Sequence, residues 1–443
     1  MKLKLLIILF IAFNVIALSQ TRKIQYTQYK LENGLTVFLH QDNSNPVVAV
    51  TLTYHVGSKN EQADRTGFAH FFEHLMFEGS KHIKRGEIDQ LIQNAGGQLN
   101  AYTSFDETGY FFLLPSNQLE LGLWIESERM LHLKIDSVGV ETQRSVVKEE
   151  RRQRIDNQPY GSLFENIFKY SFVKHPYRWT PIGSFQYIDK ATIDEFIEFY
   201  NIFYVPNNAV LSIAGDIKIP ETKKLIEKYF ADIPKGKKEI FRPSIVEPKK
   251  TEEVRDTIFD NIQLPAVIQA YHIPKQGTDD YYALNMLTTL LSSGESSRLN
   301  KRLIDNDKLA VAVGSFPIAL EDPGLFIAYS IANMGVKPDQ VEAAILDEIK
   351  KIQTELISEE EFTKIRNQTE TEFISDKNRV VGIAQALAKY HLFFGDANLI
   401  NTELERFMKV TREDIKRVAN IYLTKENRTV LYYLPKNQKG VQQ

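Results

Sequence analysis

The residues His70, Phe71, Phe72, Glu73 and His74 form an H-x-x-E-H pentad in a segment whose composition favours a helix. On a helix, positions i, i+3 and i+4 share one face, so both imidazoles and the carboxylate point the same way. Two neutral imidazoles suit a zinc ion, which as a catalytic metal takes three protein ligands and leaves one position for water. A glutamate beside that water can act as its general base. The pentad therefore predicts a zinc hydrolase, against the alternative of a helix with two partly exposed histidines.

A zinc site of this kind needs a third ligand, usually a carboxylate, from another part of the chain. The segment Val140–Arg154 is predicted to be helical, and it contains Glu149 and Glu150 after an apolar Val-Val pair. Neighbouring positions on a helix point about 100° apart, so one of the two glutamates can face the metal. Helix geometry alone leaves the choice between them open.

The reversed order of the pentad and the segments around it resemble the insulinase/pitrilysin family of zinc metallopeptidases, the inverzincins. Within that family the chain resembles the zinc-bearing subunit of the short bacterial branch that is similar to mitochondrial processing peptidases. The segments that carry the resemblance are long and cover most of the first half of the chain. They are LENGLTV at Leu31–Val37, VGSKNE at Val56–Glu61, HFFEHLMFEGS at His70–Ser80, GGQLNAYTSFDETGYFF at Gly96–Phe112, VVKEERRQR at Val146–Arg154 and YVPNNAVLSIAGD at Tyr204–Asp216.

The resemblance also implies which side chains bind the metal. In the family the third ligand is a glutamate in a V-V-x-x-E segment, and the corresponding residue here is Glu150, 76 positions after His74. The implied zinc ligands are therefore His70, His74 and Glu150, and Glu73 is the implied general base. Glu149 is the second choice for the third ligand. One Zn²⁺ per chain is expected.

The two halves of the chain resemble diverged copies of one unit. The segment at residues 191–216 matches the segment at residues 410–435, and a Tyr-His pair at residues 54–55 recurs at residues 271–272. A lysine- and proline-rich stretch between the copies is typical of an exposed linker. The predicted organisation is a signal peptide at residues 1–19, an N-terminal zinc-binding domain at residues 20–235, a linker at residues 236–253 and a homologous, metal-free C-terminal domain at residues 254–443.

Each half is predicted to begin with strands, continue with amphipathic helices and end with a strand. Strands interspersed with helices and hairpins indicate an α+β fold. The resemblance implies two homologous sheet-plus-helices domains that face each other across a chamber for peptides. In the first half we expect strands at Leu35–His40 and Val47–Tyr54, a hairpin pairing Tyr102–Ser104 with Tyr110–Phe112, and helices at about Thr66–Phe77, Lys84–Ala95, Asn117–His132 and Thr192–Tyr200.

The second half lacks the chemistry of the first. The segment that corresponds to the zinc helix, Tyr281–Leu291, contains neither histidine nor glutamate. Family members also carry, after an S-S-R-L segment of this half, an arginine and a tyrosine in the pattern R-x-x-x-x-L-x-Y, which hold the substrate carbonyl and the oxyanion. Alignment on Ser296–Leu299 and Leu309 places Ile304 and Val311 at those two positions. Neither side chain can donate a hydrogen bond to an oxyanion, a role worth about 3 kcal/mol for each donor.

The missing pair predicts that this chain works in a dimer. The partner is expected to be a homologous chain that carries the Arg/Tyr pair, or a second copy of the same chain. Arg302 is an alternative source of the arginine. A second departure from the family is Gln143, which stands where an acidic residue often supports the metal site, so that support is expected to be weaker or to come from elsewhere.

The expected activity is endopeptidase cleavage of unfolded peptides. In the family, an edge strand within Gly96–Phe112 binds the peptide by adding it as a further strand, which uses backbone groups and tolerates many sequences. The candidate substrate-binding residues are Leu99, Asn100, Ala101 and Tyr102, against the alternative of an ordinary core hairpin. The alternative function is a non-catalytic binding or assembly subunit that has kept the metal helix.

The N-terminus predicts export. A basic start, an apolar run at Leu5–Leu18 and a small-residue motif ending at Ser19 are typical of a signal peptide, so the mature chain is expected to begin near Gln20. The alternative is a single membrane anchor, but the run is shorter than the ~20 residues that span a bilayer. No other run reaches that length, so no stable membrane span is expected. A periplasmic location in a Gram-negative bacterium is predicted.

Composition excludes several other functions. The chain has no cysteine, which excludes disulfides and a thiol peptidase. A formal net charge of −3 and the absence of a basic block or a nucleic-acid motif argue against a nucleic-acid partner. Of the remaining histidines, His55 and His272 occupy matching places in the two halves, so a shared structural role is expected. His82 and His132 have no partner pattern and are assigned to solvent or packing.

Overall fold

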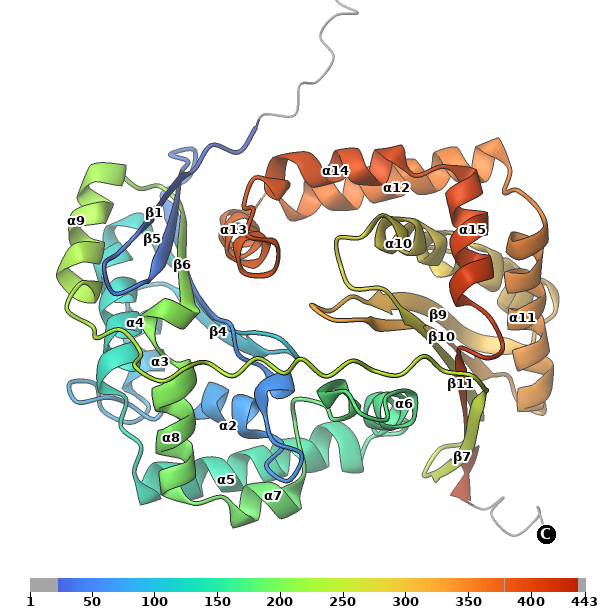
Figure 1. Ribbon diagram of the computed structural model, residues 1–443, viewed down its shortest axis with the longest axis horizontal. Helices are drawn as coiled ribbons and strands as arrows, with labels where there is room; N and C mark the ends of the chain where they lie inside the picture. The colour runs from blue at the N-terminus through green and yellow to red at the C-terminus, as the bar shows by residue number, and fades with distance from the viewer. Residues whose placement is uncertain (1–22, 378, 437–443) are drawn as a thin grey trace, which may run out of the picture.

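The structure, a computed structural model, describes residues 23–377 and 379–436, so the predicted signal peptide lies outside the described residues. It contains two mixed sheets at opposite ends of the molecule, with helices around and between them (Figure 1). The first sheet has the order β1-β2-β6-β3-β5-β4. Its strands are β1 (Thr27–Lys30), β2 (Thr36–Gln41), β3 (Val47–Tyr54), β4 (Gln98–Thr103), β5 (Thr108–Pro115) and β6 (Ala209–Gly215).

The second sheet has the order β7-β11-β8-β10-β9. Its strands are β7 (Val254–Asp260), β8 (Ala266–Ile273), β9 (Ala310–Ile318), β10 (Gly324–Ala332) and β11 (Arg428–Pro435). The order β2-β6-β3-β5-β4 of the first sheet corresponds strand by strand to the order β7-β11-β8-β10-β9 of the second, and β1 is an additional edge strand of the first sheet. The pairs β2/β6 and β7/β11 are parallel, while β3/β6 and β8/β11 are antiparallel. The shared topology confirms the predicted α+β fold with two homologous units.

The helices of the first half are α2 (Phe68–Leu75), α3 (Glu87–Asn94), α4 (Leu119–His132), α5 (Ser137–Arg151), α6 (Leu163–Ser171), α7 (Phe185–Lys190), α8 (Ile193–Phe203) and α9 (Ile219–Phe230). Those of the second half are α10 (Asp279–Ser292), α11 (Pro338–Thr354), α12 (Glu359–Asp376), α13 (Val380–Phe394), α14 (Leu399–Lys409) and α15 (Arg412–Tyr422). The strands expected at residues 35–40 and 47–54 and the helices expected in the first half differ from these bounds by at most three residues at either end. The expected hairpin is present, but Tyr110–Phe112 pairs with Leu99–Ala101 and not with Tyr102–Ser104, because the turn lies at residues 104–107. Within the described residues, no helix combines the length and the apolar character that crossing a bilayer requires.

Equivalent side chains hold equivalent places in the two halves. Thr192 and Thr411 cap α8 and α15, each in a reciprocal capping box. Asn208 donates from Nδ2 to the carbonyl of His55 (3.3 Å), and Asn427 donates in the same way to the carbonyl of His272 (2.9 Å). These contacts explain why the asparagines and the Tyr-His pairs recur together in the sequence.

Each half covers the sheet of the other with one helix. In α6, Ile167 and Phe168 are fully buried in an apolar cluster with Ile268 on β8 and Leu431 on β11. The helix α6 thus belongs by sequence to the first half and by packing to the second sheet (Figure 1).

The helix α13 makes the reciprocal contact. Its Ala384 and Leu387 are fully buried against Phe38 on β2 and Val210 on β6 of the first sheet. Thr192 and Thr411 are equivalent positions of the two halves, and the same shift in residue number aligns α6 with α13. The exchanged helices are therefore counterparts in the repeat. The two halves are therefore interlocked rather than merely adjacent.

Polar contacts join the halves as well. His55 contacts Glu321 of the second half (Nε2 to Oε2, 3.0 Å), and His272 contacts the carbonyl of Ser171 in the first half (2.8 Å). The shared structural role expected for the two histidines is thus a contact across the halves. The ammonium of Lys59, whose side chain is 5% exposed, lies between Asp106 of the first half and the second half, 3.0 Å from Asp106.

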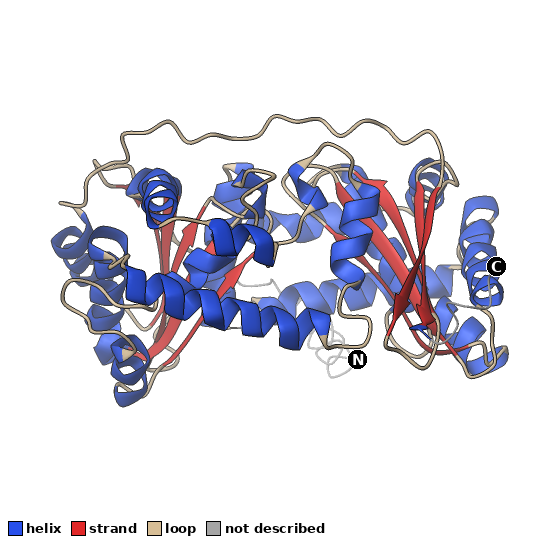
Figure 2. Ribbon diagram, turned by 90° about the horizontal axis from the view of Figure 1, so that it is seen from below, coloured by secondary structure: helices blue, strands red, loops and turns tan. Residues whose placement is uncertain are grey.

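The linker runs from one half to the other without a helix or strand between α9 and β7, and Figure 2 shows it as a long loop across the molecule. It is fastened along its length. Glu247 accepts hydrogen bonds from the backbone N–H groups of Val173, Lys174 and His175, at 2.7 to 2.9 Å. The exact domain boundaries proposed from the sequence stay a prediction.

The helix exchange predicts that the two halves unfold together. Phe168→Ala leaves a cavity between α6 and the second sheet, and such truncations cost about 3–5 kcal/mol. Both tryptophans, Trp124 and Trp179, lie in the first half, so their fluorescence reports on that half, while circular dichroism reports on both. In urea, the substitution is expected to shift both signals by the same amount.

The matched control is Val173→Ala at a position that is 62% exposed, where a change within about 0.5 kcal/mol is expected. Separate transitions in the two signals of the Phe168→Ala variant would mean that the exchanged helices do not couple the halves.

Candidate metal centre

The N-terminus of α2 is fixed by a glycine and a buried carboxylate. Gly67 caps the helix with φ at +97°, a conformation that side chains rarely adopt, and a Cβ there would lie 3.2 Å from the Cα of Gly183. The carboxylate of Glu61 accepts hydrogen bonds from the N–H groups of Gly67 (2.9 Å) and Ala69 (2.8 Å). It thereby satisfies helix donors that would otherwise be unpaired in a buried place.

One face of α2 is aromatic and packs on α8. The ring centroids of Phe68 and Phe71 lie 4.8 Å and 4.5 Å from that of Phe196, and Phe72 stacks on Phe199 at 5.3 Å. These rings occupy the inward positions of the helix, so His70, Glu73 and His74 lie on its other side. The apolar half of the pentad sequence thus orients the polar half.

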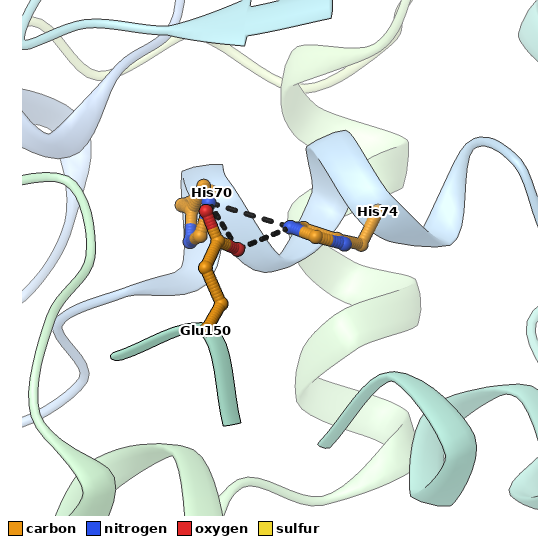
Figure 3. A group of neighbouring side chains, drawn as sticks. All are labelled: His70, His74 and Glu150. Carbon is orange, nitrogen blue, oxygen red and sulfur yellow. Dashed lines mark hydrogen bonds and ion pairs between the residues drawn. The ribbon is translucent and has the colours of Figure 1, made fainter. Parts of the chain in front are cut away.

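The structure brings His70, His74 and Glu150 together, although Glu150 comes from a different helix, α5 (Figure 3). The Nε2 atoms of the two histidines are 3.4 Å apart. Oε2 of Glu150 lies 3.1 Å from Nε2 of His74 and 3.4 Å from Nε2 of His70. The three atoms therefore form a small triangle.

This triangle fits a zinc ion. Ligand atoms at about 2.0–2.1 Å from a tetrahedral ion lie about 3.4 Å from one another. Two imidazole nitrogens that face each other repel if both carry a proton, whereas one cation between them can accept both lone pairs. Burial lowers the pKa of His70 to about 4, which keeps its imidazole in the neutral form that binds metals. The hydrogen-bonding contact with His74 lowers the pKa of Glu150, which keeps that carboxylate ionised.

The two candidate glutamates point in different directions. Glu150 directs Oε2 to the histidines and binds the guanidinium of Arg154 through Oε1, at 2.8 Å. The side chain of Glu149 is 53% exposed and contacts Arg152 (3.3 Å) and Gln153 (3.0 Å) instead. Of the two positions that the helix pattern left open, the structure places Glu150 beside His70 and His74.

Glu73 lies on the same side of α2 and is held by a residue that the sequence analysis did not assign. The hydroxyl of Thr103, at the end of β4, donates to Oε2 of Glu73 at 2.6 Å. Burial raises the pKa of Glu73, and the hydrogen bond from Thr103 opposes that rise. A carboxylate with a raised pKa suits a general base that must hold a proton and release it again.

The residues around the three candidate ligands make the following polar contacts. Gln143 donates to the carboxylate of Glu78. Nδ1 of His70 is buried and has no hydrogen-bond partner among the described residues. The outer support found here is Arg154 on Glu150, in the middle of a π-helical turn (Arg152–Asp156) that continues α5.

The strand β4 is an edge strand next to α2, because it ends the sheet order and pairs only with β5. The backbone N–H of Ser104 donates to the carbonyl of Glu107 at 2.8 Å. In an antiparallel ladder every second residue of a strand bonds its neighbour strand, so the backbone groups of Leu99 and Ala101 point to the free edge. The N–H of Ala101 is taken by the side-chain oxygen of its neighbour Asn100 (2.9 Å).

The fourth candidate substrate-binding residue, Tyr102, has a packing role. Its ring covers Gly109 on β5, where an added Cβ would lie 2.6 Å from ring atoms. The free edge is thus formed by backbone atoms, with the Tyr102 ring turned onto the sheet.

The second half contains no donor at the two positions deduced from the alignment. Ile304 packs against the apolar core of that half, and Val311 is 49% exposed on β9. Arg302, the alternative arginine, pairs with Asp307 at 2.8 Å and lies 4.0 Å from Asp347 on α11, far from α2 (Figure 1). Its guanidinium is therefore engaged away from the candidate centre.

Comparison with known proteins decides the family. The family model described as Insulinase (Peptidase family M16) matches residues 36–180, and the model described as Peptidase M16 inactive domain matches residues 190–369. Zinc protease PqqE of Helicobacter pylori is 32% identical over 409 residues, which are 91% of this chain and 92% of the relative. The chain belongs to the insulinase family of peptidases. The resemblance read from the pentad and its neighbouring segments is thereby confirmed.

Other similar proteins differ in how much of their length this chain covers. A crystal structure of a protease from Helicobacter pylori superposes with a TM-score of 0.89 at 31% identity and covers 93% of this chain and 100% of its own. A probable mitochondrial-processing peptidase subunit beta of Arabidopsis thaliana is 24% identical over 89% of this chain and 75% of its own. The periplasmic protease PqqL of Escherichia coli has the same fold (TM-score 0.76, 20% identity), and this chain spans about half of it, 49%.

Three residues that hold the centre were not singled out from the sequence. Arg154 had a readable signal, because it lies four positions after Glu150 on a predicted helix. Thr103 lies in a segment that the sequence analysis selected for another role. Glu61 had no local signal, because its carboxylate reaches a helix that begins several residues later.

The geometry of α5 predicts a difference between adjacent glutamates. Glu150→Gln is expected to lose bound zinc, because the substitution removes the charged oxygen that faces both histidines. Glu149→Gln, the matched control, is expected to keep it. Metal content of the dialysed proteins, measured by plasma emission spectrometry, tests this. Equal zinc in both variants would contradict the assignment of Glu150.

The contact with Thr103 predicts a change in pH dependence. Thr103→Val removes a hydrogen bond that lowers the pKa of Glu73, so that pKa is expected to rise further. Fewer Glu73 carboxylates are then ionised at acidic pH, and the acid limb of the kcat/KM profile for peptide hydrolysis is expected to move to higher pH. Thr103→Ser keeps the hydroxyl and should keep the limb in place. An unchanged acid limb in Thr103→Val would mean that Thr103 does not set the pKa of Glu73.

Proposed function

We propose that this protein is a zinc-dependent endopeptidase, or the metal-bearing subunit of one, that cleaves unfolded peptides. The observation that carries the proposal is the convergence of His70, His74 and Glu150 at 3.1 to 3.4 Å, with Glu73 on the same face of α2. Membership of a family whose relatives are named zinc proteases supports it.

In the proposed reaction, His70, His74 and Glu150 hold one zinc ion. That ion, when bound, lowers the pKa of coordinated water towards about 7 and makes it a nucleophile at neutral pH. Glu73 takes a proton from the attacking water as its oxygen bonds to the carbonyl carbon. As the carbon–nitrogen bond breaks, Glu73 delivers that proton to the departing amine nitrogen. Thr103 keeps the carboxylate of Glu73 in one orientation through these transfers.

The substrate is proposed to bind as a further strand on β4. The free edge beside α2 offers the backbone groups of Leu99 and Ala101, which pair with any extended peptide. Asn100 would have to release the N–H of Ala101 when the peptide arrives. An unfolded peptide has free backbone groups along its whole length, whereas most of those in a folded protein are already paired, so the site favours unfolded peptides.

A partner chain is part of the proposal. The positions of Ile304 and Val311 lack the two donors that family members are expected to use at the substrate carbonyl, and Arg302 is engaged with Asp307 and Asp347. Loss of one oxyanion donor costs roughly 10²–10³ in kcat, so the chain alone is expected to be slow. A homologous chain with the Arg/Tyr pair, or a second copy of this chain, would supply the missing groups.

The proposed location is the periplasm of a Gram-negative bacterium. The basic and apolar N-terminus supports export. One structural neighbour, PqqL of Escherichia coli, is named a periplasmic protease.

The decisive experiment assays the mature chain, from Gln20, on a quenched peptide library, alone and mixed with a homologous chain that carries R-x-x-x-x-L-x-Y. Cleavage is expected to rise strongly on mixing, with zinc retained at His70, His74 and Glu150. Glu73→Gln in the mixture is expected to lower kcat by roughly 10²–10⁴-fold while zinc stays bound, because general-base catalysis contributes that much.

Each outcome separates the possibilities. Full turnover by Glu73→Gln would show that Glu73 is not the general base. Efficient cleavage by the single chain, at a rate independent of its concentration, would contradict the need for a partner. Zinc binding without cleavage in any combination would favour the alternative, a non-catalytic binding or assembly subunit.

A further inference from the structure

A second group of metal-binding side chains lies away from the candidate catalytic centre. Among the described residues, one ligand atom each from His82, Glu128 and His132 lie within 4.8 Å of one another. Glu128 and His132 are four positions apart on α4 and so share one face, while His82 comes from the loop after α2. The expectation of solvent or packing roles is incomplete for His82, because Nδ1 of His82 contacts the carboxylate of Glu128, while the ring of His132 packs against that of His82.

We propose that His82, Glu128 and His132 form a second metal site, here called the loop site, for a divalent transition-metal ion of the zinc, nickel or copper class. Imidazole nitrogens combined with one carboxylate oxygen suit these ions, whereas calcium and magnesium prefer oxygen ligands alone. The site is independent of the catalytic proposal, because it shares no residue with His70, His74, Glu150 or Glu73.

The carboxylate of the loop site is already oriented. Oε2 of Glu128 accepts hydrogen bonds from the hydroxyl of Ser80 (2.6 Å) and from the backbone N–H of His82 (3.3 Å). These contacts turn Oε1 towards Nδ1 of His82, at 2.9 Å. The side chain of Glu128 is 7% exposed, so it is a buried charge that needs positive partners. A metal ion would replace the proton that Nδ1 of His82 shares with this oxygen.

The backbone on both sides of the loop site is fixed before any ion binds. The N–H of Lys81 donates to the carbonyl of His132 at 3.0 Å, and Ser80 forms an isolated β-bridge with Leu133. These contacts hold the loop after α2 against the C-terminal end of α4. An ion would therefore meet ligands that are largely preorganised, which lowers the entropy cost of binding.

One ligand of the loop site is uncommitted. The imidazole of His132 makes no hydrogen bond or ion pair within the described residues, and its ring meets that of His82 edge to face, with centroids 5.5 Å apart. Two nearby cations are neutralised by others, since Arg85 and Lys134 both pair with Asp136, at 3.2 Å and 3.1 Å. An incoming ion thus faces an ionised carboxylate and two imidazoles.

The proposed role is structural. The loop that carries His82 begins directly after the helix with the pentad, and an ion at the loop site would tie that loop to α4. Binding to the folded state alone stabilises it, so the melting temperature should rise with free metal concentration.

The test titrates Ni²⁺ or Zn²⁺ into the dialysed mature protein at neutral pH, with a chromophoric chelator as competitor. Wild type is expected to bind one further ion per chain beyond the metal retained at the catalytic centre. His132→Gln removes a ligand and is expected to weaken this binding by more than the roughly 10–100-fold that loss of an outer partner costs. Ser80→Ala, which removes such an outer partner, should weaken it within that range.

Two controls make the result specific. His40→Gln removes a histidine on β2 that bonds a backbone carbonyl, and it should leave the second ion in place. His74→Ala should lose the catalytic metal and keep the loop ion. Binding of only one ion per chain by wild type at saturating metal, or undiminished binding by folded His132→Gln and Ser80→Ala, would overturn the loop site.

Discussion

The reciprocal exchange of α6 and α13 is the constraint on which the rest of this structure depends. Each helix buries its apolar face on the sheet of the other half, through Phe168 in one direction and Leu387 in the other. Burying such side chains contributes about 1.5–3 kcal/mol each, and neither sheet could cover its inner face without the other half. The contacts of buried Lys59 and of the partly buried His55 and His272 then fix how the halves pack on each other.

Within this frame, the candidate centre is built where three elements of the first half meet. The aromatic face of α2 rests on α8, which turns the pentad histidines towards α5 and Glu73 towards the end of β4. Burial then sets the chemistry, because it lowers the pKa of His70 and raises that of Glu73. The same packing that stabilises the half thus favours a neutral imidazole and raises the pKa of the proposed base.

Duplication followed by divergence explains the asymmetry of the two halves. Both keep the strand order that β1 extends in the first sheet, and both keep the capped helix before the last strand. Both also keep the asparagine that donates to a histidine carbonyl near the end of the second strand of the repeat. The counterpart of α2, helix α10, contains neither histidine nor glutamate. Positions that hold the fold are kept in both copies, whereas the proposed metal ligands are present in one.

The sequence by itself determined the family, the repeat, the element bounds to within a few residues and the shared face of His70, Glu73 and His74, because helix periodicity and long matching segments are local properties. Tertiary structure decided what depends on distant segments. It placed Glu150 rather than Glu149 beside the histidines, set Thr103 on Glu73, directed Arg302 to α11 and joined His82 to Glu128 and His132. Contacts between residues far apart in the chain follow from how helices and sheets pack, and no local pattern encodes that packing.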